Sequence, residues 1–223
     1  RLAPGADPAW SSDGRRLAYV ARSGSLATIG ADGTDMRVLE VAGLPPDHRG
    51  RILQPAWSPD GSTIAFGTVE GLHVVPATGG PAQLVAAAFE AAPSWSPDGS
   101  MLSFVGSGSS VEIVRADGSG RRAIPGARSY PGRRVGWSPD GATLAFGDAQ
   151  TGGIATVGLD GRPPRQIVPY PGGSETADAV WSPDGRRIAF VDNNTDVCVV
   201  NADGSGLGRL TYAPMDAANV DPA

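Results

Sequence analysis

The chain has 223 residues, of which 40% are hydrophobic and 18% charged, and its formal net charge is -5. This charge argues against a nucleic-acid partner, because phosphate binding needs a basic surface, and no apolar run approaches the roughly 20 residues that span a bilayer. The single cysteine, Cys198, excludes an intrachain disulfide and a zinc site built on several thiolates.

A tryptophan-headed pentad recurs along the chain. It reads WSSDG at Trp10 and WSPDG at Trp57, Trp95, Trp137 and Trp181. A period of roughly 40 to 45 residues is typical of propeller blades with four strands each.

Each pentad is followed by a segment with the alternation of a β-strand. In every copy an aliphatic residue stands two positions before an aromatic one, so both point to the same face. These pairs are Leu17/Tyr19, Ile64/Phe66, Leu102/Phe104, Leu144/Phe146 and Ile188/Phe190. A third apolar run, a short turn such as ADGS and a fourth run complete each period, and no capped helical pattern interrupts them.

The pattern predicts an all-β fold: a β-propeller of four-stranded antiparallel blades in a single domain, 1–223. We expect five blades, at approximately 7–40, 54–86, 91–125, 133–168 and 177–212. Residues 213–223 would be a strand at the ring closure or the start of a further blade. Six blades, or a window of a longer array, are the alternatives.

The pentads are interpreted as turns. Proline presets φ for the first central position, aspartate favours the second and glycine accepts the left-handed conformation that follows. The five tryptophans would fill the gaps between neighbouring sheets. The aspartates, namely Asp13, Asp60, Asp98, Asp140 and Asp184, are expected to be structural, because catalysis or metal binding does not need five equivalent sites.

The succession of WSPDG, IAF, ADGS and RLT resembles the propeller repeat of the bacterial periplasmic protein TolB, from Asp7 to Tyr212. Similar repeats occur in propeller domains of prolyl oligopeptidase-type and tricorn-type peptidases. The resemblance implies a periplasmic or extracellular scaffold, although TolB has six blades and an additional N-terminal domain. The chain begins at Arg1 and shows no signal-peptide pattern, so its location is expected from the resemblance alone.

The connections of a propeller alternate between two faces. The short turns, which are nearly uniform, fall on one face, and the variable connections fall on the other, where we expect a partner to bind. The candidate residues for this interaction are Asp47, His48, Arg49, Arg128, Tyr130, Arg133, Arg134 and Tyr170. Arginine and tyrosine are enriched in interface hot spots, whereas the alternative is a solvated loop whose arginines pair with Glu90 or Asp178.

Catalytic motifs are not found. His48 and His73 are the two histidines, and the sequence has no GxSxG, HExxH or P-loop motif. The segment DNNTD offers Asp192, Asn194 and Asp196 as weak metal ligands, but Val197 stands where a calcium loop needs glycine, so a turn is the simpler interpretation.

We therefore predict a non-enzymatic, protein-binding propeller without a cofactor. The alternatives are a sensor or lectin-like propeller that binds a small ligand or glycan, and an accessory domain of a larger peptidase-type enzyme. Neither the partner nor the oligomeric state follows from the sequence.

Overall fold

The computed structural model describes residues 5–44, 52–169, 176–192 and 196–211. These residues form β-strands and turns, and their one helical element is a 3-10 turn, η2 (Ser107–Ser109). The all-β prediction is confirmed.

Five four-stranded antiparallel sheets make up the fold, and we call them blades 1 to 5 in chain order. Blade 1 consists of β1 (Gly5–Trp10), β2 (Arg16–Ala21), β3 (Leu26–Gly30) and β4 (Arg37–Val38); blade 2 of β6 (Leu53–Trp57), β7 (Thr63–Gly67), β8 (Gly71–Pro76) and β10 (Gln83–Ala87); blade 3 of β11 (Ser94–Trp95), β12 (Met101–Val105), β13 (Ser110–Arg115) and β14 (Arg122–Arg128); blade 4 of β15 (Gly136–Trp137), β16 (Thr143–Gly147), β17 (Ile154–Gly158) and β18 (Arg165–Val168); and blade 5 of β19 (Thr176–Trp181), β20 (Arg187–Asp192), β21 (Asp196–Asn201) and β22 (Gly208–Arg209). A further parallel pair joins β5 (Val41–Ala42) to β9 (Gly80–Pro81).

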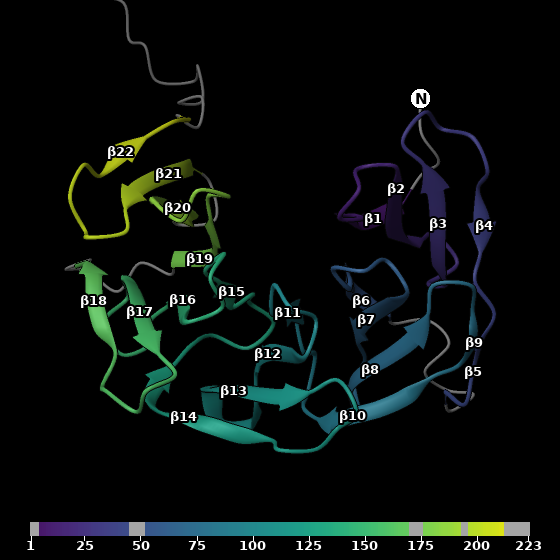
Figure 1. Ribbon diagram of the computed structural model, residues 1–223, viewed down its shortest axis with the longest axis horizontal. Helices are drawn as coiled ribbons and strands as arrows, with labels where there is room; N and C mark the ends of the chain where they lie inside the picture. The colour runs from purple at the N-terminus through teal and green to yellow at the C-terminus, as the bar shows by residue number, and fades with distance from the viewer. Residues whose placement is uncertain (1–4, 45–51, 170–175, 193–195, 212–223) are drawn as a thin grey trace, which may run out of the picture.

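The blades are arranged in an arc around a common axis, with the first strand of each blade on the inside (Figure 1). Blades 1 and 5 stand at the two ends of this arc (Figure 1). The prediction of a five-bladed propeller is confirmed. The expected strand or further blade at 213–223 lies outside the described residues.

The aliphatic–aromatic pairs form the contacts between blades. In blade 2, Ile64 and Phe66 pack against Leu26 of blade 1 in one apolar cluster. The pairs of blades 3, 4 and 5 join the preceding blade in the same way. Because Phe66, Phe104 and Phe146 are each 0% exposed, each buries enough apolar surface to stabilise the fold by roughly 1.5–3 kcal/mol.

The side of blade 5 that faces away from blade 4 is more exposed than the equivalent side of blades 1 to 4. On β21, Val197 is 36% exposed and Val199 is half-buried, whereas Cys198 and Val200, which face blade 4, are buried. The residues that correspond to Val197 in blades 1 to 4 are all 0% exposed: Leu26, Leu72, Val111 and Ile154. Within the described part of the chain, blade 5 therefore packs against blade 4 and exposes part of its other side.

Candidate functional site

The pentads form hydrogen-bonded turns on one end of the axis, which we call the turn face. Ser58 Oγ donates to Asp60 Oδ1 at 2.6 Å, and the same carboxylate oxygen accepts from the Ser62 backbone N–H at 3.0 Å. Gly61 adopts a φ of 72°, which is the conformation expected of it in this turn. The equivalent serine and backbone N–H bind Asp13, Asp98, Asp140 and Asp184.

These bonds stabilise the ionised aspartates. The hydroxyl of Ser58, followed by the backbone and hydroxyl groups of Ser62, lowers the pKa of Asp60 to about 2. The pKa of each of the other four carboxyl groups is also lowered, primarily by its own serine hydroxyl. An exposed carboxylate held by a turn in this way is stabilised in its ionised form by local donors.

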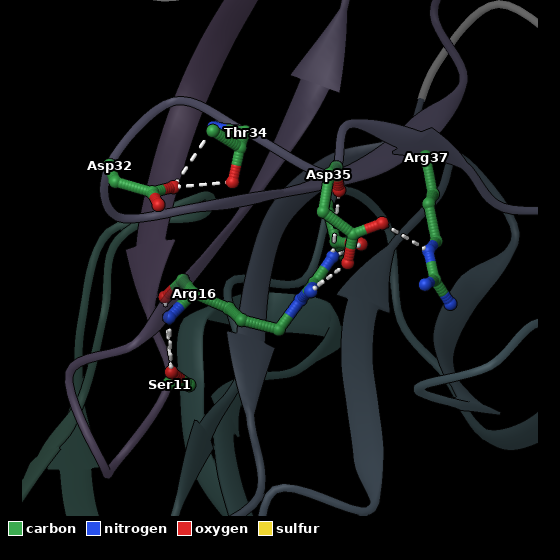
Figure 2. Close-up of polar contacts among 7 residues, drawn as sticks. Ser11, Arg16, Asp32, Thr34, Asp35 and Arg37 are labelled. Carbon is green, nitrogen blue, oxygen red and sulfur yellow. Dashed lines mark hydrogen bonds and ion pairs between the residues drawn. The ribbon is translucent and has the colours of Figure 1, made fainter.

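The second turn of blade 1 shows the same local pairing. Asp32 Oδ1 accepts from the backbone N–H and the hydroxyl of Thr34 at 2.9 and 2.7 Å (Figure 2). Beside it, Asp35 forms ion pairs with Arg16 at 2.6 Å and Arg37 at 2.9 Å (Figure 2). The charged side chains of Arg16, Asp35 and Arg37 on this part of the turn face are therefore paired with one another.

The tryptophans occupy the gaps between inner strands. Trp95 Nε1 donates to the carbonyl of Ala56 at 3.0 Å, and Trp137 Nε1 donates to that of Ser94 at 3.1 Å, so each indole is bonded to the preceding blade. The indole N–H groups of Trp57 and Trp181 are buried and have no hydrogen-bond partner.

The other end of the axis, which we call the loop face, holds strained backbone. Asp7, Gln54 and Asp178 have φ values of 50°, 46° and 55°. Each stands three residues before a tryptophan, at a break in strand register in β1, β6 and β19. Left-handed conformations are unfavourable for residues other than glycine, and such strain is often retained at functional sites.

Polar contacts link these positions across the axis. Asp7 Oδ2 accepts from the Gln54 backbone N–H at 3.2 Å, and Gln54 Nε2 donates to the Gly132 carbonyl at 2.7 Å. Asp178 Oδ1 accepts from the Arg134 backbone N–H at 3.1 Å, and its second oxygen lies 3.8 Å from the Arg133 guanidinium. We call Asp7, Gln54, Arg133, Arg134 and Asp178 the axial cluster.

Arg134 is the central member of the axial cluster. Its guanidinium donates to the carbonyls of Pro55 at 3.2 Å and Pro93 at 3.3 Å, which belong to blades 2 and 3. Burial lowers the pKa of Arg134 from its ordinary value, and the negative charges of Asp178 and Asp7 oppose that shift. An arginine remains protonated under these conditions, so the axis contains a half-buried positive charge.

The arginines at 121–134 do not form one cluster. Arg121 stands just before β14 and pairs with Glu112 at 2.7 Å, donates to the Ala87 carbonyl at 3.0 Å and lies over the Phe104 ring at 5.5 Å. Arg128 ends that strand on the loop face, where it donates to the Gly108 carbonyl at 2.7 Å. Arg121 therefore connects blades 2 and 3, whereas Arg128 lies on the loop face.

Part of the predicted binding set is brought together on the loop face. Tyr130 is half-buried, and its carbonyl accepts from the Arg133 backbone N–H at 3.3 Å. Arg133 contacts Asp178, one of the two acids expected to pair with this segment. The other four candidates, Asp47, His48, Arg49 and Tyr170, lie outside the described residues.

Phe89 joins this surface without having been a sequence candidate. Its side chain is 60% exposed in the connection from blade 2 to blade 3. The neighbouring Glu90 carbonyl lies 4.0 Å from the position that a Cβ on Gly132 would occupy, so this connection adjoins the Tyr130–Arg133 segment. A lone phenylalanine in an alanine-rich connection was the signal that could have identified it.

The remaining candidates occupy packed positions. His73 is 4% exposed and stacks on Phe66 with the ring centroids 5.5 Å apart. Cys198 is buried, and desolvation raises the pKa of its thiol.

The weak metal candidates bind an arginine. Asp192 and Asp196 both contact the Arg209 guanidinium, at 3.0 and 3.3 Å, while Asn194 lies outside the described residues. Within the part of the chain that the structure describes, no three histidine, cysteine or acidic side chains gather as metal ligands would.

Among the described residues, none belongs to a helix with the length and apolar character that crossing a bilayer requires.

Solved structures share this fold, although no protein-family model and no curated protein sequence matches the chain. A protein of Agrobacterium tumefaciens assigned as TolB superimposes with a TM-score of 0.76 at 21% identity, over 94% of this chain and 81% of that chain. TolB of Acinetobacter baumannii superimposes with a TM-score of 0.71 at 21% identity, over 89% of this chain and 53% of that chain. A chain in a nidogen/laminin complex superimposes with a TM-score of 0.73 at 13% identity, over 93% of this chain and 79% of that chain. The chain therefore has a TolB-like propeller fold.

Proposed function

We propose that this chain is a non-enzymatic propeller that binds a partner protein through its loop face and the axis beneath it. The TolB-like fold is compatible with a protein-binding scaffold, and one of its structural neighbours was solved within a nidogen/laminin complex. The observation that carries the proposal is backbone strain at the axis: Asp7, Gln54 and Asp178 hold left-handed conformations at equivalent positions around its loop-face end.

The chemistry of the surrounding surface supports a protein partner. Phe89 and Arg128 are exposed, and Tyr130 and Arg133 are half-buried beside them. Tyrosine and arginine side chains are enriched among the few residues that dominate interface energetics. The repeat's resemblance to that of periplasmic TolB favours an extracytoplasmic location.

Affinity capture from the source organism tests this proposal. The exposed loop-face residues are replaced in the variant Phe89→Ser/Arg128→Ser, and the control variant Arg162→Ser/Arg186→Ser removes two exposed arginines from the turn face. We expect the wild type and the control to recover the same partner from an extracytoplasmic fraction, and the loop-face variant to lose at least tenfold of it, because removing two hot-spot side chains commonly costs more than about 1.4 kcal/mol. Equal recovery by all three proteins would reject the loop face as the binding surface.

A further inference from the structure

The turn-face end of the axis is hollow. A cavity of about 470 Å³ lies between the inner strands and turns of blades 1 to 3. Its walls include Trp10, Trp57, Trp95, Pro59 and Pro97, and it reaches Arg134. We call this cavity the axial funnel; it opens on the face opposite to the one proposed to bind a protein.

The charge of Arg134 is incompletely balanced where it meets the funnel. Among the described residues, its guanidinium donates to two neutral carbonyls, those of Pro55 and Pro93, and no described carboxylate forms an ion pair with it. Arg134 is also the one charged residue among the described side chains that line the funnel. A guanidinium in a desolvated site gains more from an anionic acceptor than from a neutral one.

The walls suit a flat apolar group. Trp10 is 58% exposed, so its indole offers a broad surface, and Trp57 and Trp95 line the same cavity. Aromatic rings stack favourably on indoles in offset or edge-to-face arrangements. The unpartnered Trp57 N–H adds a donor to this wall that a small side-chain movement could use.

We propose that the axial funnel binds a small carboxylate that carries a flat aromatic group. The carboxylate accepts hydrogen bonds from the Arg134 guanidinium, and the ring lies among Trp10, Trp57 and Trp95. A free aromatic acid and the carboxyl terminus of a peptide ending in phenylalanine present this same chemistry, so the experiment has to separate the two sources.

Calorimetry and tryptophan fluorescence with matched probes test the ligand class. Benzoate is compared with neutral benzamide, and a tripeptide ending in phenylalanine is compared with its C-terminal amide. We expect each acid to bind at least roughly tenfold more tightly than its amide, because a charge-assisted bond to a half-buried arginine is replaced by a neutral one. Preference for benzoate over the tripeptide acid identifies a free acid as the ligand, and the reverse identifies a peptide terminus; equal binding of acids and amides overturns the proposal.

Three variants locate the site. Arg134→Gln is expected to abolish the preference for acids, and Trp10→Ala to weaken benzoate binding several-fold at an exposed position that the core does not need. Arg162→Gln serves as the matched control, because Arg162 is exposed on the turn face, pairs with Asp160 and does not line the funnel. If Arg134→Gln does not fold, the Trp10 variant decides: unchanged benzoate affinity there rejects the funnel as the site.

Discussion

The two faces of the propeller are stabilised in different ways. On the turn face, each pentad closes its own turn, as when Ser58 and Ser62 bind Asp60. The bonds between blades on this face are additions to that repeated pattern, donated by Ser12, Gln83 and Arg165 to carbonyls of the next blade. On the loop face, the contacts run between blades, as when Gln54 of blade 2 donates to Gly132 ahead of blade 4.

This difference separates stability from recognition. A contact confined to one repeat can recur in every blade without reference to its neighbours, so the turn face is uniform. A contact between blades depends on which residues the other blade offers, so the loop face varies and can become specific. Stability should therefore depend mainly on the repeated residues, and partner binding on the residues that do not recur.

Two phenylalanines give the largest expected difference. Phe104→Ala removes a side chain that is 0% exposed between blades 2 and 3, which should cost about 3–5 kcal/mol. Phe89→Ala removes an exposed side chain from the loop face and should change the free energy of unfolding by less than about 0.5 kcal/mol. Urea denaturation measures both, and a comparable loss from the two variants would contradict the separation.

The second prediction compares two tryptophans that occupy equivalent positions of the repeat. Trp95→Phe removes the hydrogen bond to the Ala56 carbonyl, whereas Trp57→Phe removes an indole N–H that has no partner. Because the change in side-chain size is the same, Trp95→Phe should destabilise the protein by about 1 kcal/mol more than Trp57→Phe. Chemical denaturation of the two variants provides the test, and a larger loss for Trp57→Phe would show that the repeated indoles are not held by this bond.

The smallest expected effect is the pH dependence of the stability that the Asp60 turn contributes. The pKa of Asp60 is about 2 in the folded chain and 3.8 for an unperturbed aspartate, so the unfolded state binds more protons between these values. The stabilisation by ionised Asp60 is thus complete above pH 4 and is lost as the pH falls toward 2.

Asp60→Asn should reduce the steepness of acid destabilisation in that window and leave the slope near neutral pH unchanged. Thermal unfolding at a series of pH values reports this slope, with the loop-face variant Asp178→Asn as the comparison. An identical acid slope in wild type and Asp60→Asn would argue against a stabilised carboxylate in the turn.

The sequence predicted the features that recur and missed those that arise where blades meet. Five copies of a pentad and of an aliphatic–aromatic pair were sufficient to predict the blades, because strand alternation and turn chemistry are local properties. The strained residues were not predictable in the same way. Pro8 and Pro55 follow Asp7 and Gln54, and a residue before proline is biased toward extended backbone, so the local sequence gave no indication of a positive φ.

The arginines of residues 121–134 illustrate a second limit. They are close in the sequence, which suggested one basic patch, but β14 (Arg122–Arg128) carries the chain from the turn face to the loop face. The ends of that strand pair with Ile113 and Ser110 of β13, so at about 3.3 Å per residue they lie roughly 10 Å apart along the blade. Contacts with other blades decide which face each arginine reaches. They also place Arg134, half-buried, at the axis, where it donates to carbonyls of Pro55 and Pro93.

The partly uncovered side of blade 5 has a consequence for how the molecule fluctuates. A blade clamped between two neighbours cannot open without breaking both interfaces, whereas blade 5 breaks one, the interface of Phe190 and Cys198 with blade 4. In a nearest-neighbour array the unit with fewer interfaces has the lower local unfolding free energy. Blade 5, like blade 1 at the other end of the arc, should therefore open transiently while blades 2 to 4 remain folded, and its opening would take Asp178, its contribution to the axial cluster, away from Arg134.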